Sequence, residues 1–240
     1  MSESQLDPLV RRLKNVAKLR DDSAALLSKL PHHAVELGAG HLLYEAGHSN
    51  LPCYVLVEGC VTRFKLRTDG SRAIVAFELS GDIINYETLL LNHVDCGATI
   101  TVRSKIAIVE HAAMNEARET DRKLDVALWR YALVKAAALE EWLLNVGRRS
   151  PTGRLAHLLL ELHLRLIAVG SSNDYASKVQ ASPQDLADAM GLQQVIVTRS
   201  LHELASQNIV ELTEDTTILR DLDRLARIAE FRSDYLHMAS

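Results

Sequence analysis

The segment from Ser182 to Leu204, SPQDLADAMGLQQVIVTRSLHEL, holds two short amphipathic patterns on either side of one glycine. Ser182 followed by Pro183 is a typical helix start, because serine caps free amide groups and proline fits the first turn. Gly191 ends this first helix, where glycine adopts a left-handed backbone at little cost. The apolar residues of its inner face are Leu186, Ala187 and Met190. Two helices joined by so tight a turn predict a helix-turn-helix.

The second helix is expected from Gln193 to Ser206, and its inward residues are Val197, Leu201 and Leu204. Glutamine can bind adenine and arginine can bind guanine, while threonine and apolar side chains can meet thymine methyl groups. Val195 and Ile196 either serve that last role or belong to the core. The outward residues therefore predict contacts to DNA bases from Gln193, Gln194, Val195, Thr198 and Arg199. Contacts to phosphate are expected from Ser182, Gln184 and His202.

The following segment, NIVELTEDTTILRDL, reads as a small β-hairpin, the wing of a winged helix-turn-helix that spans residues 149–240. Residues 148–240 contain ten Arg and Lys against twelve Asp and Glu. Since phosphate neutralisation by cations drives non-specific binding, we expect weak non-specific DNA binding and a modest salt dependence.

Short β-type runs fill residues 34–113 and are separated by glycines about ten residues apart. Asp69-Gly70 predicts a hairpin turn, because this pair readily adopts positive φ. These features indicate an antiparallel β-roll. Residues 1–33 before it have helical spacing and form a separate segment.

Residues 114–148 predict one long helix, since Asn115 to Gly147 contains no proline and no glycine before its end. An a/d seam predicts dimer contacts from Leu124, Leu128, Tyr131, Lys135, Ala138 and Trp142. A second apolar side holds Leu133, Leu139, Leu143 and Val146. The roll can cover one side and a second copy of the helix the other. The alternative is a helix buried entirely in the core.

The composition is that of a globular protein, with 240 residues, 48% hydrophobic, 24% charged and a net charge of -4. Three cysteines form no disulfide framework and suit a reducing cytosol, so we expect a cytoplasmic protein. The N-terminus has no signal-like apolar run, and no stretch suits a membrane span.

This order of segments resembles the Crp/Fnr superfamily of bacterial transcription regulators over nearly the whole chain. The resemblance lies in GDIINYETLLLNHVDCGATITV, GRRSPTGRLAHLLLEL and the helix-turn-helix, and the last two are most similar to alphaproteobacterial regulators of the FixK/NnrR kind. It implies an α+β protein with an N-terminal cyclic-nucleotide-binding-like β-roll, a long dimerisation helix and a C-terminal winged helix-turn-helix. Such a protein binds a palindromic double-stranded DNA operator as a homodimer, with RNA polymerase as a partner if it is an activator.

In that family the positions of Gln194, Val195 and Arg199 contact bases, and that of His202 meets phosphate. The usual Arg-Glu pair is Gln194-Val195 here, so a TGTGA-type half-site is not expected, whereas Arg199 should still read a guanine.

Cyclic-nucleotide-binding members carry a Gly-Glu pair and an Arg-Ser or Arg-Thr pair, and those positions here are Asn85-Tyr86 and Cys96-Gly97. Tight binding of cAMP or cGMP is therefore not expected. If another effector binds, its position suggests a pocket near Tyr86, Glu87, Cys96, Leu128 and Tyr131.

No metal site is predicted. Iron–sulfur members use four cysteines mostly near the N-terminus, and this chain has none before Cys53, so no such cluster is expected. Haem remains an alternative, with His93 and Cys96 or His41 and His48 as axial ligands, although such histidines are usually ordinary surface residues. Cys53 and Cys60 are expected in the core, and Cys96 in a polar loop is the one candidate for a redox response.

Two other classes of function compete with a DNA-binding regulator. A cupin-like enzyme needs clustered histidines and carboxylates on facing strands, and the predicted strands carry almost none, so no catalytic residue is assigned. A non-catalytic effector-binding protein could use its winged helix to bind protein, which the acidic C-terminal part keeps open.

Overall fold

The computed structural model describes residues 4–170, 178–213 and 216–238, and the chain divides into two compact units. The first unit comprises Met1–Lys65, Ala76–Ala136 and His237–Ser240. The second comprises Leu66–Val75 and Ala137–Leu236. No helix among the described residues is long and apolar enough to cross a membrane.

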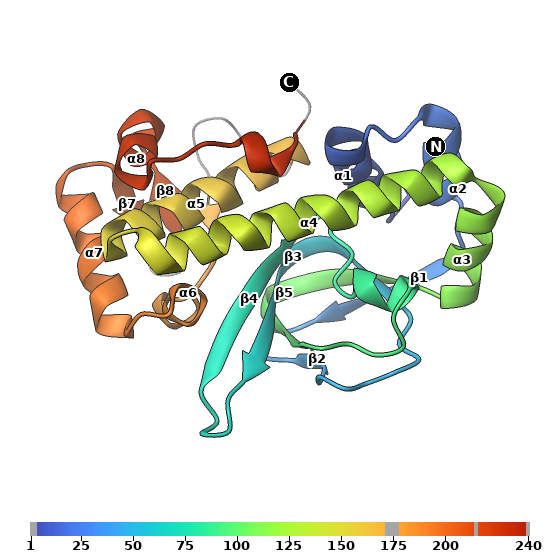
Figure 1. Cartoon of the computed structure of the whole chain (residues 1–240), viewed down its shortest axis with the longest axis horizontal. Helices are drawn as coiled ribbons and strands as arrows, with labels where there is room; N and C mark the ends of the chain where they lie inside the picture. The colour runs from blue at the N-terminus through green and yellow to red at the C-terminus, as the bar shows by residue number, and fades with distance from the viewer. Residues whose placement is uncertain (1–3, 171–177, 214–215, 239–240) are drawn as a thin grey trace. The chain divides into compact units, whose positions relative to one another are not determined.

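The first unit is built on an antiparallel β-roll (Figure 1), as the glycine spacing predicts. Its strands follow the order β1-β5-β3-β4, and β2 also pairs with β5. Their bounds are β1 His32–Leu37, β2 Leu42–Tyr44, β3 Cys53–Leu66, β4 Arg72–Leu79 and β5 Gly97–Val109. The end of β3 and the start of β4, within Leu66–Val75, are counted with the second unit. An apolar core inside the roll contains Tyr44, Leu56, Val61, Ile84, Val94, Ala98, Ile100 and Ile106.

The turn between β3 and β4 is the predicted Asp-Gly hairpin. Gly70 has φ +81°, and the backbone N–H of Arg67 donates to the carbonyl of Ser71 at 2.9 Å. Asp69 fixes the turn from the side, because its carboxylate accepts from the N–H of Ser71 at 2.9 Å.

Helices cover the roll and form a second core with it. They are α1 Asp7–Ala17, α2 Asp21–Ser28, the short 3-10 helix η1 Tyr86–Leu89, α3 His111–Thr120 and α4 Arg122–Arg148, whose first half up to Ala136 lies in this unit. The second core joins apolar residues of α1 and α2 with strand residues such as Val55 and with Leu124, Leu128 and Tyr131 of α4.

The prediction of one continuous helix over Asn115–Gly147 is wrong. The chain leaves helical geometry at Asp121, with φ -119° and ψ 95°, so α3 and α4 are separate helices. The Asp121 carboxylate accepts from the N–H of Lys123 at 2.9 Å and thereby caps the start of α4. An aspartate preference for helix starts is the physical reason for the break.

The predicted dimer seam is also wrong, because it lies on the buried side of α4. Leu124, Leu128, Tyr131 and Lys135 are buried within the first unit. Farther along, Ala138 is half-buried, and the indole N–H of Trp142 donates to the buried Glu161 at 2.9 Å. The apolar residues that α4 leaves exposed are Val126, Trp129, Leu133, Leu139, Leu143, Leu144 and Val146.

The second unit contains a winged helix-turn-helix, as the sequence predicts. Its helices are α5 Pro151–Ala168, α6 Pro183–Met190, α7 Gln194–Ser206, α8 Leu222–Ala229 and the 3-10 helix η2 Asp234–Leu236. Helix α5 contacts α6, α7 and α8 and is the scaffold of the unit. The wing is an antiparallel sheet of order β6-β8-β7, formed by β6 Lys178–Val179, β7 Val210–Leu212 and β8 Thr217–Leu219. Residues 214–215 of its predicted tip lie outside the described residues.

Candidate nucleic-acid interface

The turn between α6 and α7 has the geometry that the Ala-Gly spacing predicts. Gly191 adopts φ +61°, and its N–H donates to the carbonyl of Ala187, as does that of Leu192 at 3.1 Å. The predicted inward residues are all buried: Leu186, Ala187, Met190, Val197, Leu201 and Leu204. Their packing fixes the angle between the helices and decides which face of α7 remains exposed.

The exposed face of α7 carries most of the predicted base-contacting residues. Gln193, Gln194, Arg199 and His202 are exposed, Thr198 is half-buried, and the Val195 side chain is 66% exposed. Ile196 is half-buried, so Val195 is the apolar residue that this face presents. Within the described ranges, no side chain forms a hydrogen bond or ion pair with Arg199.

The predicted phosphate contacts at α6 are already partly engaged within the chain. The Ser182 hydroxyl accepts from the N–H of Asp185 at 3.0 Å as the helix cap. The Gln184 amide donates to the Asp188 carboxylate at 2.6 Å. Both side chains are exposed, so their atoms reach solvent at the positive end of the α6 dipole.

Helix α5 holds α7 from behind through contacts that sequence reasoning missed. The Thr152 hydroxyl donates to the Glu203 carboxylate at 2.9 Å, and its oxygen lies 3.3 Å from the Ser200 hydroxyl. The Arg154 guanidinium donates to the carbonyl of Met190 at 3.2 Å, at the end of α6. These bonds set the orientation of α7, and no local sequence pattern reveals them.

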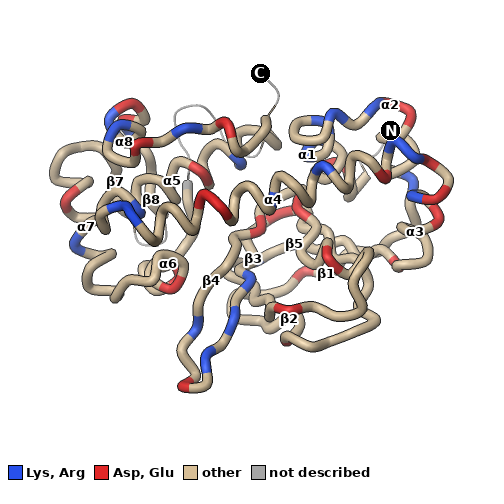
Figure 2. The backbone as a smooth tube through the Cα atoms, viewed as in Figure 1, with Lys and Arg blue, Asp and Glu red and all other residues tan. Residues whose placement is uncertain are grey.

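Charge is sparse around this face, as Figure 2 shows along α7. Arg199 is the single Lys or Arg of α7, and beside the wing Arg220 is paired with Glu211. The Arg224 side chain donates to the side chain of Gln207 at 3.0 Å. The interface therefore offers hydrogen-bonding and apolar groups for base edges rather than a dense set of cations for phosphates.

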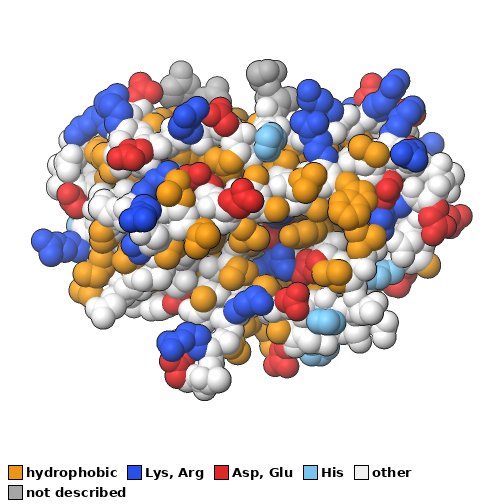
Figure 3. All heavy atoms as spheres, in the orientation of Figure 1, with side chains coloured by type: hydrophobic (Ala, Val, Ile, Leu, Met, Phe, Trp, Pro, Cys, Tyr) orange, Lys and Arg blue, Asp and Glu red, His pale blue; other side chains and the backbone are white. Residues whose placement is uncertain are grey.

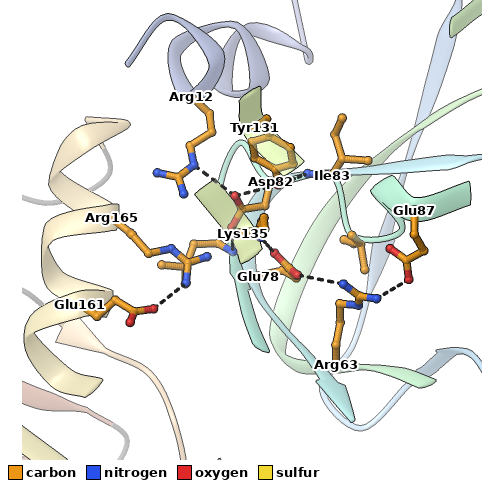
Figure 4. A network of polar contacts seen from close by, with 12 residues as sticks. Arg12, Arg63, Glu78, Asp82, Ile83, Glu87, Tyr131, Lys135, Glu161 and Arg165 are labelled. Atoms are coloured by element: carbon orange, nitrogen blue, oxygen red, sulfur yellow. Dashed lines mark hydrogen bonds and ion pairs between the residues drawn. The ribbon is translucent and has the colours of Figure 1, made fainter. Parts of the chain in front are cut away.

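In the first unit, two of the residues suggested as an effector pocket, Tyr86 and Glu87, contact a buried arginine (Figure 4). Arg63 of β3 pairs with Glu87 of η1 and lies 3.9 Å from the Glu78 carboxylate. Its guanidinium carbon lies 5.5 Å from the centre of the Tyr86 ring, which contacts the Tyr131 ring edge-on. The remaining two residues, Leu128 and Cys96, are buried.

The ion pairs continue from Glu78 to α4 and α1. Lys135 pairs with Glu78 and lies 3.5 Å from Asp82. Asp82 also accepts from Arg12 at 3.2 Å and from the Tyr131 hydroxyl at 3.1 Å. Sequence reasoning noted Lys135 but missed the network. The sequence did contain a sign of it, because the charged residues Arg63 and Glu78 lie in mostly apolar strand-like runs and would need buried partners.

The expected redox thiol and haem ligands do not fit their surroundings. Cys96 lies in the predicted loop, directly before β5, but is buried there, and burial raises the pKa of its thiol, which lowers its reactivity. His93 is exposed and lies 3.4 Å from Asp95, and His48 contacts the carbonyl of Glu45 at 3.1 Å. His41 is exposed as well. These histidines line no buried apolar site that would hold a haem.

Two family models match the chain, a Crp-like helix-turn-helix domain over residues 153–228 and a cyclic nucleotide-binding domain over residues 34–121. The nitrogen fixation regulation protein FixK of Azorhizobium caulinodans is 31% identical over 176 residues, which cover 73% of this chain and 70% of that protein. The chain belongs to the Crp/Fnr family of transcription regulators. FixK of Rhizobium meliloti is 30% identical over 179 residues, covering 75% of this regulator and 78% of that protein.

The fold of this Crp/Fnr regulator is similar to that of a solved relative. The structure of FixK2 from Bradyrhizobium japonicum matches with a TM-score of 0.75 and 25% identity, covering 83% of this chain and 98% of that chain. The protein is a FixK-like transcription regulator with a helix-turn-helix DNA-binding domain, and its relatives are regulators rather than enzymes. The cupin-like enzyme is thereby excluded.

Proposed function

We propose that this protein is a homodimeric, sequence-specific regulator that binds an inverted-repeat operator through α7. The observation that carries the proposal is the exposure of Gln194, Val195 and Arg199 on α7, whose opposite face is buried. Gln193 and Thr198 flank them as further base contacts, and His202 reaches a phosphate. The capped start of α6 at Ser182 and Gln184 holds a second phosphate.

A second copy of α4 is the proposed cover for the exposed apolar stripe of this helix. Trp129, Ala136 and Leu143 recur every seven residues, which is the repeat of a two-helix seam, and all three are exposed. Leu133 and Leu143 are 65% and 77% exposed. Orange side chains follow α4 on the face shown in Figure 3. A continuous stripe of this kind on a helix surface is typical of a protein interface.

Cyclic nucleotides and haem are not part of the proposed mechanism. The region near Tyr86 and Tyr131 is filled by the chain's own charged side chains, Arg63, Glu78 and Lys135 among them, which leave the phosphate of a nucleotide no unpaired guanidinium. RNA polymerase is a further partner if the regulator activates transcription.

Selection of fragmented genomic DNA by the purified protein, with no ligand added, tests the proposal. We expect enrichment of a palindrome whose half-sites lie one turn of DNA apart, ~34 Å, because two recognition helices of a dimer are set at that spacing. Enrichment of single half-sites would refute the dimer, and enrichment of no sequence, even with cell extract added, would favour a winged helix that binds protein.

A further inference from the structure

Six charged side chains form a buried, charge-balanced network in the first unit (Figure 4). Three are cations and three are anions: Arg12, Arg63, Lys135, Glu78, Asp82 and Glu87. Removing charges from water costs several kcal/mol for each ion in a protein interior, so such a set is stable only when every charge has a partner. The loss of one member leaves a buried charge uncompensated.

Glu87 is the member of the network that the segment after β4 and its turn supplies. It lies in the short helix η1, and its carboxylate pairs with Arg63 of β3. The Glu87 side chain is 11% exposed, much like those of Arg63 and Lys135 at 10% each. Arg63 is held from the other side by Glu78 at 3.9 Å, and its Nε atom has no hydrogen-bond partner among the described residues. The guanidinium is thus a buried cation that binds an anion supplied by η1.

The opposite end of the network determines how α4 lies on the roll. Lys135 and Tyr131 project from one face of α4 onto Glu78 and Asp82, which belong to β4 and the turn after it. The N–H of Ile83 donates to the Tyr131 hydroxyl at 3.1 Å and adds a backbone bond to the same contact. Because these bonds bury one face of α4, they leave Trp129, Leu133 and Ala136 on the exposed face.

We infer that Glu87 is an internal anion that takes the place of an anionic effector at Arg63, and that the network thereby holds α4 in its dimer-forming orientation without a bound ligand. The inference rests on the proposed function, since α4 must present its exposed face for two DNA-binding domains to act together. Helix α4 continues without interruption to Arg148, three residues before α5 begins at Pro151.

Chemical rescue of a Glu87→Ala variant tests the inference. The variant removes the anion and leaves the Arg63 guanidinium open to small carboxylates. Operator affinity without added ligand should fall by about tenfold or more, within the 5–150-fold range usual for coupled sites. Sodium acetate should restore most of the affinity, whereas acetamide and sodium chloride at matched ionic strength should not. Dimerisation, measured by sedimentation, should fall and recover in parallel.

A matched control is Glu36→Ala, which removes one carboxylate from the exposed Arg103–Glu36 pair of the same roll. It should keep wild-type affinity and show no response to acetate. If Glu87→Ala folds poorly, Glu87→Gln keeps the size of the side chain and should still lower ligand-free affinity.

The outcomes separate this inference from the proposed function. The role of Glu87 as an internal anion would be overturned if both Glu87 variants kept wild-type operator affinity. It would also be overturned if acetate did not restore the affinity that Glu87→Ala loses. Operator binding by the wild type only after a small molecule is added would also overturn it, while the DNA-binding function would stand. Failure of the wild type to select any operator would instead overturn the proposed function.

Discussion

Val195 presents an isopropyl group at the exposed start of α7. Gln194 before it and Arg199 after it can read bases by hydrogen bonds. An apolar side chain in the major groove distinguishes thymine by its C5-methyl group. Replacement of a contacted thymine by deoxyuridine removes that methyl and leaves the hydrogen bonds unchanged. We expect about a fourfold loss of affinity, since burial of a methyl-sized group contributes roughly 0.8 kcal/mol. The Val195→Ala variant should lose this discrimination, and equal sensitivity in both proteins would contradict the contact.

Arg199 should contribute specificity at one base pair of each half-site. The Arg199→Ala variant is expected to lose roughly 1–3 kcal/mol at that base pair and to tolerate every base there. Selection of operators with the wild type and the variant measures this directly. Arg232→Ala, which removes an exposed arginine paired with Asp234, is the control for loss of charge alone. An unchanged preference in Arg199→Ala would show that another residue reads this position.

The face of α7 could be read from the sequence because one helical period decides it. Val197, Leu201 and Leu204 point inward at helical spacing, so Gln194 and Arg199 must point outward. The network around Arg63 could not be read in this way. Its members are distant in the sequence, and only strand pairing and the packing of α4 bring Arg63, Glu78 and Lys135 together.

Helix α4 shows that an apolar pattern alone does not predict which face of a helix packs in the core and which face remains exposed. The sequence contains two apolar faces, and the face with Leu124, Leu128 and Tyr131 has the more regular seam. That face packs in the core of the first unit because Lys135 and Tyr131 bind acidic residues of the roll there. Lys135, which interrupts the seam, was the sign that this face met buried carboxylates rather than a second helix.

Helix α5 carries a buried histidine that makes the stability of the second unit depend on pH. Burial, together with the nearby Arg149 cation, lowers the pKa of His157 to about 4, although Glu141 at 3.3 Å acts in the opposite direction. The rings of Phe231 and Tyr235 enclose the imidazole, with centroids 4.9 Å and 5.9 Å away. The folded protein therefore keeps His157 neutral in a pH range where an unfolded chain would protonate it.

The sign of this effect follows from the proton balance. Between pH 6.5 and pH 4 the unfolded state binds more protons at this histidine, so stability is fully present above pH 6.5 and decreases as the pH falls. We expect His157 to account for about 3 kcal/mol of the loss in unfolding free energy at pH 4. Urea unfolding at pH 6.5 and at pH 4 should show a smaller loss of unfolding free energy in His157→Phe than in the wild type. An equal loss in wild type and variant would assign the pH dependence to other groups.

The charge balance of the protein predicts how DNA binding responds to salt. The Arg149, Arg165, Arg220 and Arg232 side chains of the second unit all pair with carboxylates. If each protomer neutralises two phosphates, the slope of log Kobs against log salt is roughly -4. Operator titrations between low and physiological salt measure this slope. A slope near -10 would require a more basic surface than the described residues around α7 present.

The exposed stripe of α4 predicts that dimerisation and operator binding fail together. A glutamate at Leu133 or Leu143 would place like charges opposite each other in an apolar seam, so Leu133→Glu and Leu143→Glu should sediment as monomers at micromolar concentration. Each monomer keeps its α7 face, and should therefore bind a half-site weakly but lose its preference for the palindrome. Leu42→Glu makes the same change at an exposed leucine of β2 and should remain dimeric. A dimeric Leu143→Glu variant with normal operator affinity would place the contact between protomers on another surface.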